Sequence, residues 1–240
     1  MLIFPNSWSM PQIEYIVKAL QLAESGYVTF EYETRGWWAS GGQIDVAGPL
    51  DRRDISSVID FVESNADKWN ANTSAIAFIG ISYGAGLSLE AAGFEPRVKA
   101  AVSMSGWVNL TLGLYKHNTP NTAWVKLLEV TADIVGHPSS ELAELIHDLD
   151  HHENMSSVFA FAAKRSSISN VSFTNGRNTP ILISNNFLDR LFKPQDMINY
   201  YNMLTTPKMI LLNHGVHAEA ETAGKSGQPE LHLDRGPSLR

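Results

Sequence analysis

The segment Gly80-Ile81-Ser82-Tyr83-Gly84 fits the pattern G-x-S-x-G and stands between two contrasting runs. Residues 75–81 (AIAFIGI) are typical of a buried strand, and residues 83–93 (YGAGLSLEAAG) are typical of a helix of small residues. Between a strand and a helix, the pattern predicts a tight turn that lifts the serine hydroxyl above a sheet. The helix N-terminus would place N–H groups and partial positive charge beside it, which suits a developing oxyanion. Ser82 is therefore the predicted nucleophile.

A serine hydroxyl attacks a carbonyl carbon efficiently only when a histidine, oriented by a carboxylate, removes its proton. In the strand–serine–helix context the expected order along the chain is serine, acid, histidine. Asp189 directly follows the strand-like run 180–185 and is the predicted acid. Asp196 is the alternative, but it follows Pro194 and falls within a predicted helix.

Two histidines, His214 and His217, follow the last strand-like run, residues 208–213. His214 directly adjoins the strand, where it could serve as a packed residue. His217 lies farther along the loop, from which it could reach Ser82. We favour His217 as the general base, and His214 remains the alternative.

The oxyanion needs two N–H donors. The first is expected from Tyr83, the residue after the nucleophile, and the second from the loop Asn6-Ser7-Trp8 after the first strand. A metal site is not expected. His147 and His151 have the i, i+4 spacing of a helical ligand pair beside His152 and Glu153, but no further ligand stands at a fixed spacing, which favours a solvated face. We expect no cofactor.

The elements that must position these residues alternate along the chain. Strand-like runs are residues 2–4, 27–32, 75–81, 98–104, 180–185 and 208–213, and helix-like runs are residues 13–24, 51–65, 83–93 and 194–204. This order predicts an α/β fold with a mostly parallel, doubly wound sheet.

The stretch between the fourth and fifth strand-like runs follows another pattern. Residues 124–135 and 140–149 keep helical periodicity, and we see no convincing strand there. We expect a core of residues 1–108 and 176–221, a helical cap insertion of residues 109–175 over the carboxyl ends of the strands, and a flexible tail or linker of residues 222–240. A helical subdomain that serves only for packing is the alternative.

Composition excludes several classes of protein. The 240 residues carry a formal charge of −7 and no cluster of Lys and Arg, which argues against a nucleic-acid groove. No cysteine is present, so a thiol nucleophile and a disulfide framework are excluded. The N-terminus lacks the features of a signal peptide, and no apolar run is long enough for a membrane span. We expect a soluble, cytoplasmic protein of unspecified oligomeric state.

Three motifs together carry a family resemblance. The loop Thr34–Gly42 fits T-R-G-x-x-x-S-x-G, the nucleophile segment fits G-x-S-Y-G, and Leu188–Pro194 fits L-D-x-L-F-x-P. With the late histidine, they resemble the Xaa-Pro dipeptidyl-peptidases (peptidase family S15) and the cocaine-esterase-like and glutaryl-acylase-like hydrolases. The resemblance implies an α/β-hydrolase fold.

Carried over residue by residue, the resemblance implies a triad of Ser82, Asp189 and His217. It places the oxyanion donors on the Tyr83 amide and at Trp8. Relatives such as the cocaine esterase have a tyrosine at that second position, so here the Trp8 indole or a backbone N–H near Ser7 would take its place. Relatives also begin with further strands, and many end in a β jelly roll. Neither has a counterpart here, and we expect a short member or a fragment.

The expected reaction is hydrolysis of an ester or amide through an acyl-enzyme. An Xaa-Pro peptidase must anchor a free amine with buried carboxylates, and we identify no such pair. An esterase needs an apolar pocket, which four tryptophans could line, although packing is the alternative for them: Trp37, Trp38, Trp107 and Trp124. We therefore rank an esterase acting on a small ester above a peptidase acting on a short peptide. A catalytically inactive binding module is the third hypothesis.

Overall fold

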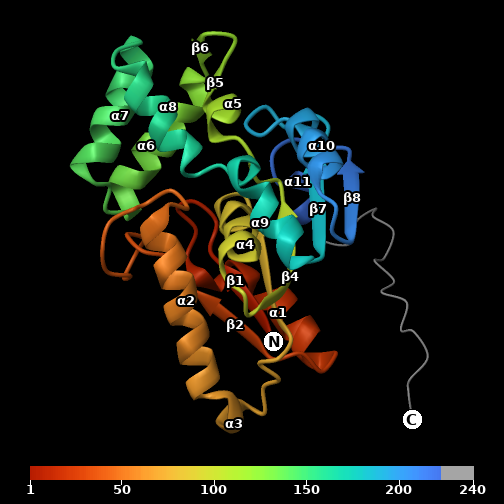
Figure 1. Ribbon diagram of the computed structural model, residues 1–240. Coiled ribbons are helices and arrows are strands. Elements are labelled where there is room, and N and C mark those ends of the chain that lie inside the picture. Colours follow the sequence, from red (N-terminus) through yellow and green to blue (C-terminus); the bar gives the residue numbers. More distant parts are fainter. Residues whose placement is uncertain (223–240) are drawn as a thin grey trace.

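Six strands form the central sheet of the protein, of which the computed structural model describes residues 1–222. They are β1 (Leu2–Pro5), β2 (Thr29–Tyr32), β3 (Ile76–Ile81), β4 (Val98–Met104), β7 (Ile181–Asn186) and β8 (Lys208–Asn213). All neighbours are parallel, and the order across the sheet is β2-β1-β3-β4-β7-β8 (Figure 1). The expected doubly wound parallel sheet is confirmed. The order reverses at β1, and in such sheets ligands bind at the carboxyl ends of the strands near the reversal.

Helices cover both faces of the sheet. The 3₁₀ helix η1 (Gln12–Tyr15) and α1 (Ile16–Glu24) lie on one face, where Tyr15 packs with alternate residues of β1 and β3. The helices α2 (Pro49–Ser64), α4 (Tyr83–Phe94) and α10 (Pro194–Met203) contribute to the apolar clusters on the other face. Coverage on both faces explains why the strands read as nearly continuous apolar runs.

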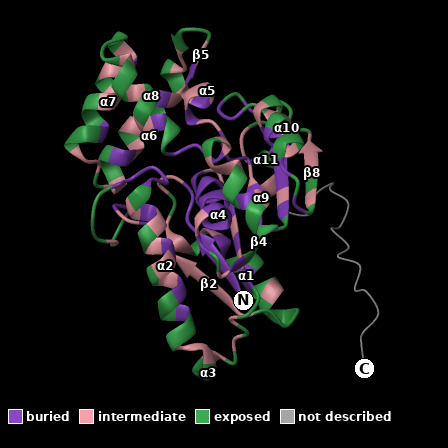
Figure 2. Ribbon diagram, in the orientation of Figure 1, coloured by how far each residue is buried: buried purple, intermediate pink, exposed green. Residues whose placement is uncertain are grey.

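The helix α4 is the most deeply buried helix, as Figure 2 shows. Its small residues allow close approach to its neighbours. A Cβ atom added at Gly86, for example, would lie 2.6 Å from the Trp107 ring. This close packing holds the N-terminus of α4 in a fixed position at the end of β3.

Most of the chain between β4 and β7 forms a separate group of elements beyond the carboxyl ends of the strands (Figure 1). In order this group contains α5 (Leu110–Leu114), β5 (Tyr115–Lys116), β6 (Thr119–Pro120), α6 (Thr122–Val135), α7 (Ser140–His151) and α8 (Met155–Ala163), and η2 (Ser167–Asn170) and α9 (Val171–Arg177) follow it. We call residues 110–163 the cap.

The cap differs from the expected all-helical insertion in two respects. The strands β5 and β6 form an antiparallel hairpin, which sequence periodicity missed because each strand has only two residues. In addition, η2 and α9 lie within the expected range 109–175 but pack against α4 beside the sheet. The last part of that range therefore belongs with the helices that cover the core.

Polar contacts tie the cap to the core at two places. Just beyond its C-terminal end, the Arg165 guanidinium lies 2.6 Å from the Asp45 carboxylate, and the Trp107 indole donates to the Arg165 carbonyl at 2.6 Å. At the start of α6, the Asn121 side chain donates to the Arg190 carbonyl at 3.1 Å. Apolar side chains fill the space between these contacts.

Other expectations differ only at their limits. The second strand begins at Thr29 instead of residue 27, and the helix expected over residues 13–24 is divided into η1 and α1. The small helices α3 (Ala66–Trp69) and α11 (Glu219–Thr222) were not expected. Apart from Thr222, the expected tail of residues 222–240 lies outside the described residues.

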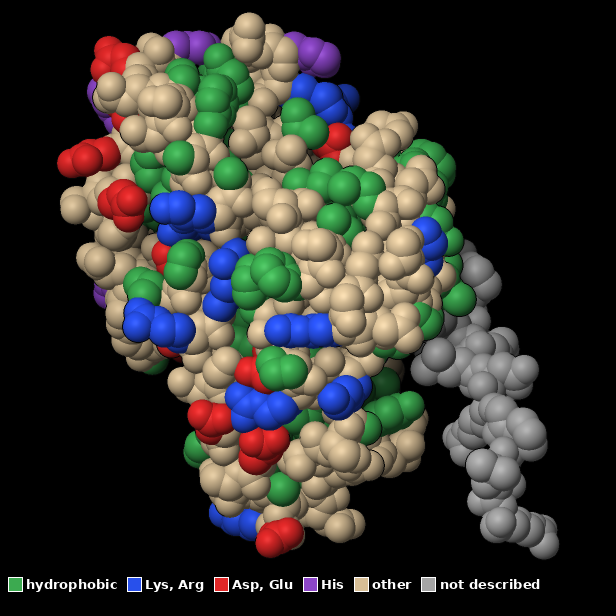
Figure 3. Space-filling view, in the orientation of Figure 1, with side chains coloured by type: hydrophobic (Ala, Val, Ile, Leu, Met, Phe, Trp, Pro, Cys, Tyr) green, Lys and Arg blue, Asp and Glu red, His purple; other side chains and the backbone are tan. Residues whose placement is uncertain are grey.

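The surface agrees with the mixed charge of the sequence. On the face drawn in Figure 3, basic and acidic side chains are interspersed instead of forming a continuous basic surface. Within residues 1–222, no helix combines the length and apolar character that a membrane crossing requires.

Candidate active site

Ser82 occupies a strained turn between β3 and α4. Its φ and ψ angles are 53° and −110°, a backbone conformation that residues other than glycine rarely adopt. The turn is possible because the residues two positions before and after Ser82 are glycines: a Cβ at Gly80 would collide with the backbone of Gly84, and one at Gly84 would collide with the Pro5 carbonyl. The Ser82 amide continues the sheet by donating to the Met104 carbonyl at 2.9 Å. These constraints hold the side chain at the carboxyl edge of the sheet.

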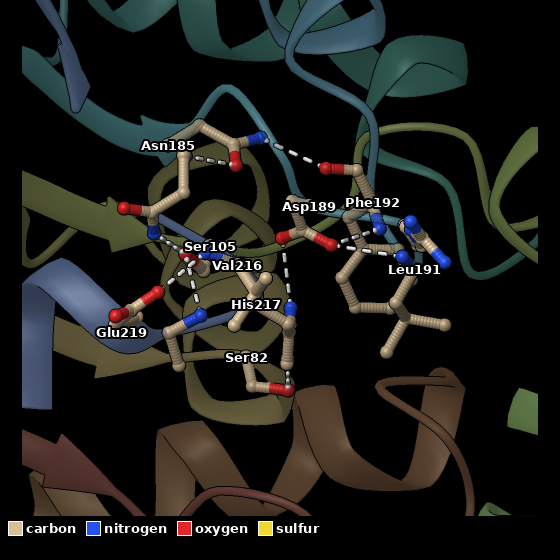
Figure 4. A network of polar contacts seen from close by, with 12 residues as sticks. Ser82, Ser105, Asn185, Asp189, Leu191, Phe192, Val216, His217 and Glu219 are labelled. Atoms are coloured by element: carbon tan, nitrogen blue, oxygen red, sulfur yellow. Dashed lines mark hydrogen bonds and ion pairs between the residues drawn. The ribbon is translucent and has the colours of Figure 1, made fainter. Parts of the chain in front are cut away.

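The hydroxyl of Ser82 belongs to a chain of three hydrogen-bonded side chains (Figure 4). His217 Nε2 lies 2.9 Å from Ser82 Oγ, and His217 Nδ1 lies 2.8 Å from Asp189 Oδ2. The three residues follow β3, β7 and β8, and parallel strands bring their carboxyl ends to one edge. The arrangement can transfer the serine proton to the imidazole while the carboxylate holds the ring.

Asp189 is held in one orientation by its neighbours. Its carboxylate is buried, and Oδ1 accepts the backbone N–H groups of Leu191 and Phe192 at 2.8 and 2.9 Å. The other oxygen, Oδ2, faces His217. The imidazole is flanked by the rings of Trp124 and Phe192, each with its centroid 5.5 Å away. The acid and the base are therefore positioned from several sides.

The two alternative residues lie in other surroundings. Asp196 is in the first turn of α10, and its carboxylate is 3.7 Å from the Lys116 ammonium. His214 is exposed on the loop after β8, whereas His217 contacts Ser82. The structure thus brings together the three residues that the sequence favoured.

Polar residues that we did not identify in the sequence anchor the histidine loop. Ser105, directly after β4, accepts the Ala218 N–H at 3.3 Å and the Asn186 amide at 2.9 Å. Glu221 accepts from Ser184, Asn186 and Ser105 at 2.7, 2.7 and 3.2 Å. Ser105 has an unusual backbone conformation, with a φ of 49°. This angle is known only from the structure, so the sequence carries no signal for the role of Ser105.

Two backbone N–H groups are available for an oxyanion. Within the described residues, the amides of Tyr83 and Trp8 have no hydrogen-bond partner. The Trp8 indole, by contrast, donates to the Leu128 carbonyl and the Thr131 hydroxyl on α6, both at 3.1 Å. The expectation that the indole could serve as the oxyanion donor is therefore wrong, because α6 already engages it. The Trp8 backbone amide remains the candidate.

The loop that carries Trp8 is fixed by side chains of the same region. Asn6 accepts both the amide and the hydroxyl of Thr34, at 2.8 and 2.9 Å, and this contact joins the loop to the T-R-G segment. Ser7 donates to the Ile81 carbonyl at 2.9 Å, and the Tyr15 hydroxyl accepts the Ile81 amide at 2.9 Å. The loop of residues 6–8 is thus hydrogen-bonded to the end of β3, directly before the turn at Ser82, and is held next to that turn.

An apolar cavity of about 100 Å³ adjoins Ser82 beneath the cap. Of the four tryptophans proposed to line a pocket, Trp107 does so. Trp37 is fully buried in the core, and Trp38 is half-exposed with its indole bonded to the Ser9 carbonyl, so neither lines the cavity. Trp124 lies outside it, against the His217 ring.

The comparisons with known proteins give the family. Residues 6–219 match the family described as X-Pro dipeptidyl-peptidase (S15 family). The chain belongs to this family. The family and the fold make it a serine hydrolase. A search of curated proteins found no match.

Solved structures share the fold of this S15-family chain at low sequence identity. One is DcsB in complex with its substrate analogue, with a TM-score of 0.65 and 15% identity over 93% of this chain and 84% of that chain. The Pyrococcus horikoshii acylaminoacyl peptidase has a TM-score of 0.61 and 15% identity over 91% of this chain and 33% of that chain. The acetyl xylan esterase of Paenibacillus sp. R4 has a TM-score of 0.62 and 20% identity over 90% of this chain and 68% of that chain. This chain therefore spans only a third of the length of the acylaminoacyl peptidase.

In this S15-family chain a buried acidic residue, Asp51, contacts Tyr83, the residue after Ser82. Asp51 Oδ2 accepts the Tyr83 hydroxyl at 2.9 Å and the Ala47 amide at 2.8 Å, whereas Oδ1 is buried without a partner among the described residues. Burial raises the pKa of Asp51 to about 7, and the nearby carboxylates of Asp45 and Asp54 add to the effect. Burial also raises the pKa of the Tyr83 hydroxyl well above its usual value.

The histidines of the cap do not form a metal site in the described part of the chain, where no cluster of three or more potential ligands occurs. The rings of His147 and His151 stack at 4.0 Å on α7, and the His152 ring packs against Tyr115.

Proposed function

We propose that the protein hydrolyses carboxylic esters by acyl transfer, with Ser82 as nucleophile, His217 as base and Asp189 as the group that orients the imidazole. The observation that carries the proposal is the hydrogen-bonded chain of these side chains beside an apolar cavity. The family match is consistent with this chemistry.

In the proposed reaction, Ser82 Oγ bonds to the carbonyl carbon while its proton passes to His217 Nε2. The Asp189 carboxylate stabilises the resulting imidazolium, and the amides of Tyr83 and Trp8 stabilise the negative carbonyl oxygen. When the carbon–oxygen bond breaks, His217 returns the proton to the departing alcohol and the acyl group stays on Ser82. A water molecule then attacks the acyl-enzyme by the same route and releases the acid.

The character of the cavity favours an ester over an Xaa-Pro peptide. A dipeptidyl-peptidase must hold a protonated N-terminal amine, and burying a cation without a carboxylate partner is costly. None of the described residues that line the cavity is charged. An uncharged acyl group therefore fits it better than the charged end of a peptide. In this proposal the cap excludes water from the bound acyl group.

An Xaa-Pro dipeptidyl-peptidase is the second candidate, and the family match is the observation that favours it. Among the structural neighbours, one is named an acylaminoacyl peptidase and another an acetyl xylan esterase, so both classes of reaction occur on this fold. A catalytically inactive binding module is the third candidate.

The test combines a covalent probe with parallel substrates. A fluorophosphonate should label the wild-type protein and not Ser82→Ala, and the substitution should lower the turnover of p-nitrophenyl butanoate by at least about 10⁴-fold. We expect the wild type to prefer p-nitrophenyl butanoate to alanyl-prolyl p-nitroanilide.

The alternatives predict other outcomes. Preference for the anilide would support the peptidase, whereas absence of both labelling and turnover in the folded protein would support the inactive module. Full turnover by Ser82→Ala would contradict the assignment of the nucleophile.

A further inference from the structure

The cavity beneath the cap reaches the nucleophile of the proposed catalytic centre but not its base. On the core side it is lined by Ser82, by Tyr83 and by Trp8, which supply the nucleophile and the two free amides. Its other walls come mainly from the cap helices α5, α6, α7 and α8, together with core residues such as Phe192, which packs against the His217 ring. His217 itself is absent from the described residues that line it. The cavity therefore opens at the nucleophile and the two free amides, and the base is not part of its wall.

This arrangement decides which half of an ester enters the cavity. In the proposed reaction the departing oxygen takes its proton from His217 Nε2, so the alcohol must lie on the histidine side of the tetrahedral centre. The carbonyl oxygen points to the amides of Tyr83 and Trp8. The remaining substituent of the reacting carbon is the acyl chain, and the direction left for it leads into the cavity.

The histidine side is much more open than the cavity. The acid loop and the histidine loop are joined by a hydrogen bond from the Leu188 amide to the Gly215 carbonyl. Leu188 is 52% exposed, and Val216, next to Gly215, is 51% exposed. On α6, Leu127 lies one turn beyond Trp124, which packs against His217, and is 51% exposed. An alcohol group at this side would keep much of its contact with water.

The size and chemistry of the cavity define the acyl group. An apolar cavity of roughly 150 Å³ is known to accept benzene, so the volume of about 100 Å³ here fits roughly four carbon atoms beyond the carbonyl. The lining residues are almost entirely aliphatic or aromatic. A charged or strongly polar acyl group would lose its hydration without compensation.

We propose that the cavity is an acyl-chain site and that the enzyme selects esters by their acid half. The preferred substrates carry an uncharged, apolar acyl group of about four to six carbons. The structure of the alcohol half has only a small effect on kcat/KM. This inference rests on the proposed acyl-transfer function and extends it by naming the substrate class and its orientation.

A pair of isomeric esters tests the orientation without any change to the protein. Ethyl hexanoate and hexyl acetate have the same atoms, but the six-carbon chain lies on the acid half in one and on the alcohol half in the other. Because each buried methylene contributes favourably, we expect kcat/KM for ethyl hexanoate to be roughly 10- to 100-fold higher. An equal or reversed preference would overturn the proposal.

A series of p-nitrophenyl esters tests the capacity of the site. We expect kcat/KM to rise from acetate to a maximum between butanoate and hexanoate and then to fall for decanoate, because the cavity has no room for the longer chain. A steady rise to decanoate would contradict the proposed size of the site.

A matched pair of variants locates the effect. Leu145→Trp places a larger side chain in the cavity from the helix α7, whereas Leu20→Trp makes the same change on the exposed surface of α1, where no residue lines the cavity. We expect Leu145→Trp to keep acetate turnover but to lower hexanoate turnover at least 10-fold, and Leu20→Trp to change both less than threefold. Equal effects of the two variants would count against the acyl-chain site.

The acetate ester separates the two proposals. A two-carbon acyl group needs no cavity, so its turnover and fluorophosphonate labelling report on Ser82 chemistry alone. If acetate is not hydrolysed and Ser82 is not labelled, the proposed function fails. If acetate is hydrolysed but longer acyl groups gain nothing, only the acyl-chain site fails.

Discussion

The carboxyl edge of the sheet and the cap contribute to the same site through different kinds of interaction. At the sheet edge, hydrogen bonds of 2.8 and 2.9 Å join Ser82, His217 and Asp189. Two backbone N–H groups donate to the other oxygen of the Asp189 carboxylate. The cap surrounds the cavity with aliphatic and aromatic side chains and is tied to the core by a few polar contacts. Hydrogen bonds fix direction, whereas apolar packing fixes mainly volume.

This difference has a consequence for substitution. A change of a few tenths of an ångström at the sheet edge alters a proton transfer, because the donor and the acceptor must face each other. The cap tolerates exchange of one apolar residue for another of similar volume. We therefore expect changes at the sheet edge to affect the rate with every substrate, and changes in the cap to affect stability and the choice of substrate.

The largest effect is expected for Asp189→Asn. The asparagine can keep the bonds from Leu191 and Phe192, but its NH₂ group would then face His217 Nδ1. The imidazole would turn to the tautomer that carries hydrogen on Nε2, which cannot accept the Ser82 proton. We expect kcat to fall about 10⁴-fold. Steady-state kinetics with p-nitrophenyl acetate measure it, and a loss below tenfold would show that Asp189 does not orient the base.

The second effect concerns the attachment of the cap. Arg165→Met leaves the buried Asp45 carboxylate without its cation, and such a loss typically costs about 3–5 kcal/mol of unfolding free energy. Urea denaturation measures this change. Because Ser82 and His217 are held by the sheet, the folded variant should still react with a fluorophosphonate.

A matched control separates burial from charge. Arg35 pairs with Asp54 at 2.7 Å, but both side chains are more exposed, and Arg35→Met should cost less than about 1 kcal/mol. Equal losses in the two variants would mean that the buried pair does not have the special role that we assign to it. Asp45→Asn should restore part of the stability of Arg165→Met.

The third effect is a dependence of stability on pH, caused by Asp51 next to the turn at Ser82. Burial raises the pKa of Asp51 to about 7, well above the value of about 3.9 for an unfolded aspartate. Between these two values the folded state binds the proton and the unfolded state does not. The free energy of unfolding therefore decreases as the pH rises through this window, by up to about 1.4 kcal/mol per pH unit.

Asp51→Asn should remove this dependence while keeping an acceptor for Tyr83 and Ala47. We expect the variant to match the wild type near pH 4 and to become progressively more stable relative to it towards pH 7. Urea denaturation at pH 4, 5, 6 and 7 measures the difference. Parallel curves for the two proteins would contradict the raised pKa.

Much of the core was predictable because its signals are local. The apolar runs around β3, β4, β7 and β8 and the G-x-S-x-G turn each depend on neighbours in the sequence. The two-residue strands of the cap hairpin were missed because they are too short to show a period. The prediction that Trp37, Trp38 and Trp124 line the pocket was wrong because the sequence does not show whether a tryptophan packs in the core, lies at the surface or lines a cavity.

The anchors of the site were not predictable for a different reason. Ser105 and Glu221 lie 116 positions apart, and they meet because Ser105 follows β4, Glu221 lies on α11 after β8, and β7 joins these two strands in the sheet. A serine and a glutamate carry no sequence signal for this contact. The partnership of Asn6 with Thr34 likewise depends on the pairing of β1 with β2.

The sequence by itself determined the kinds of groups present, their order along the chain and the parallel architecture, because residue type and short-range periodicity control these properties. Only the tertiary structure decided that His217 Nε2 reaches Ser82 Oγ across 135 positions, that α6 engages the Trp8 indole, and that Ser82 lines the cavity whereas His217 does not. Distances and directions of this kind arise when the strands pair and the cap packs on the sheet, since each depends on many contacts at once.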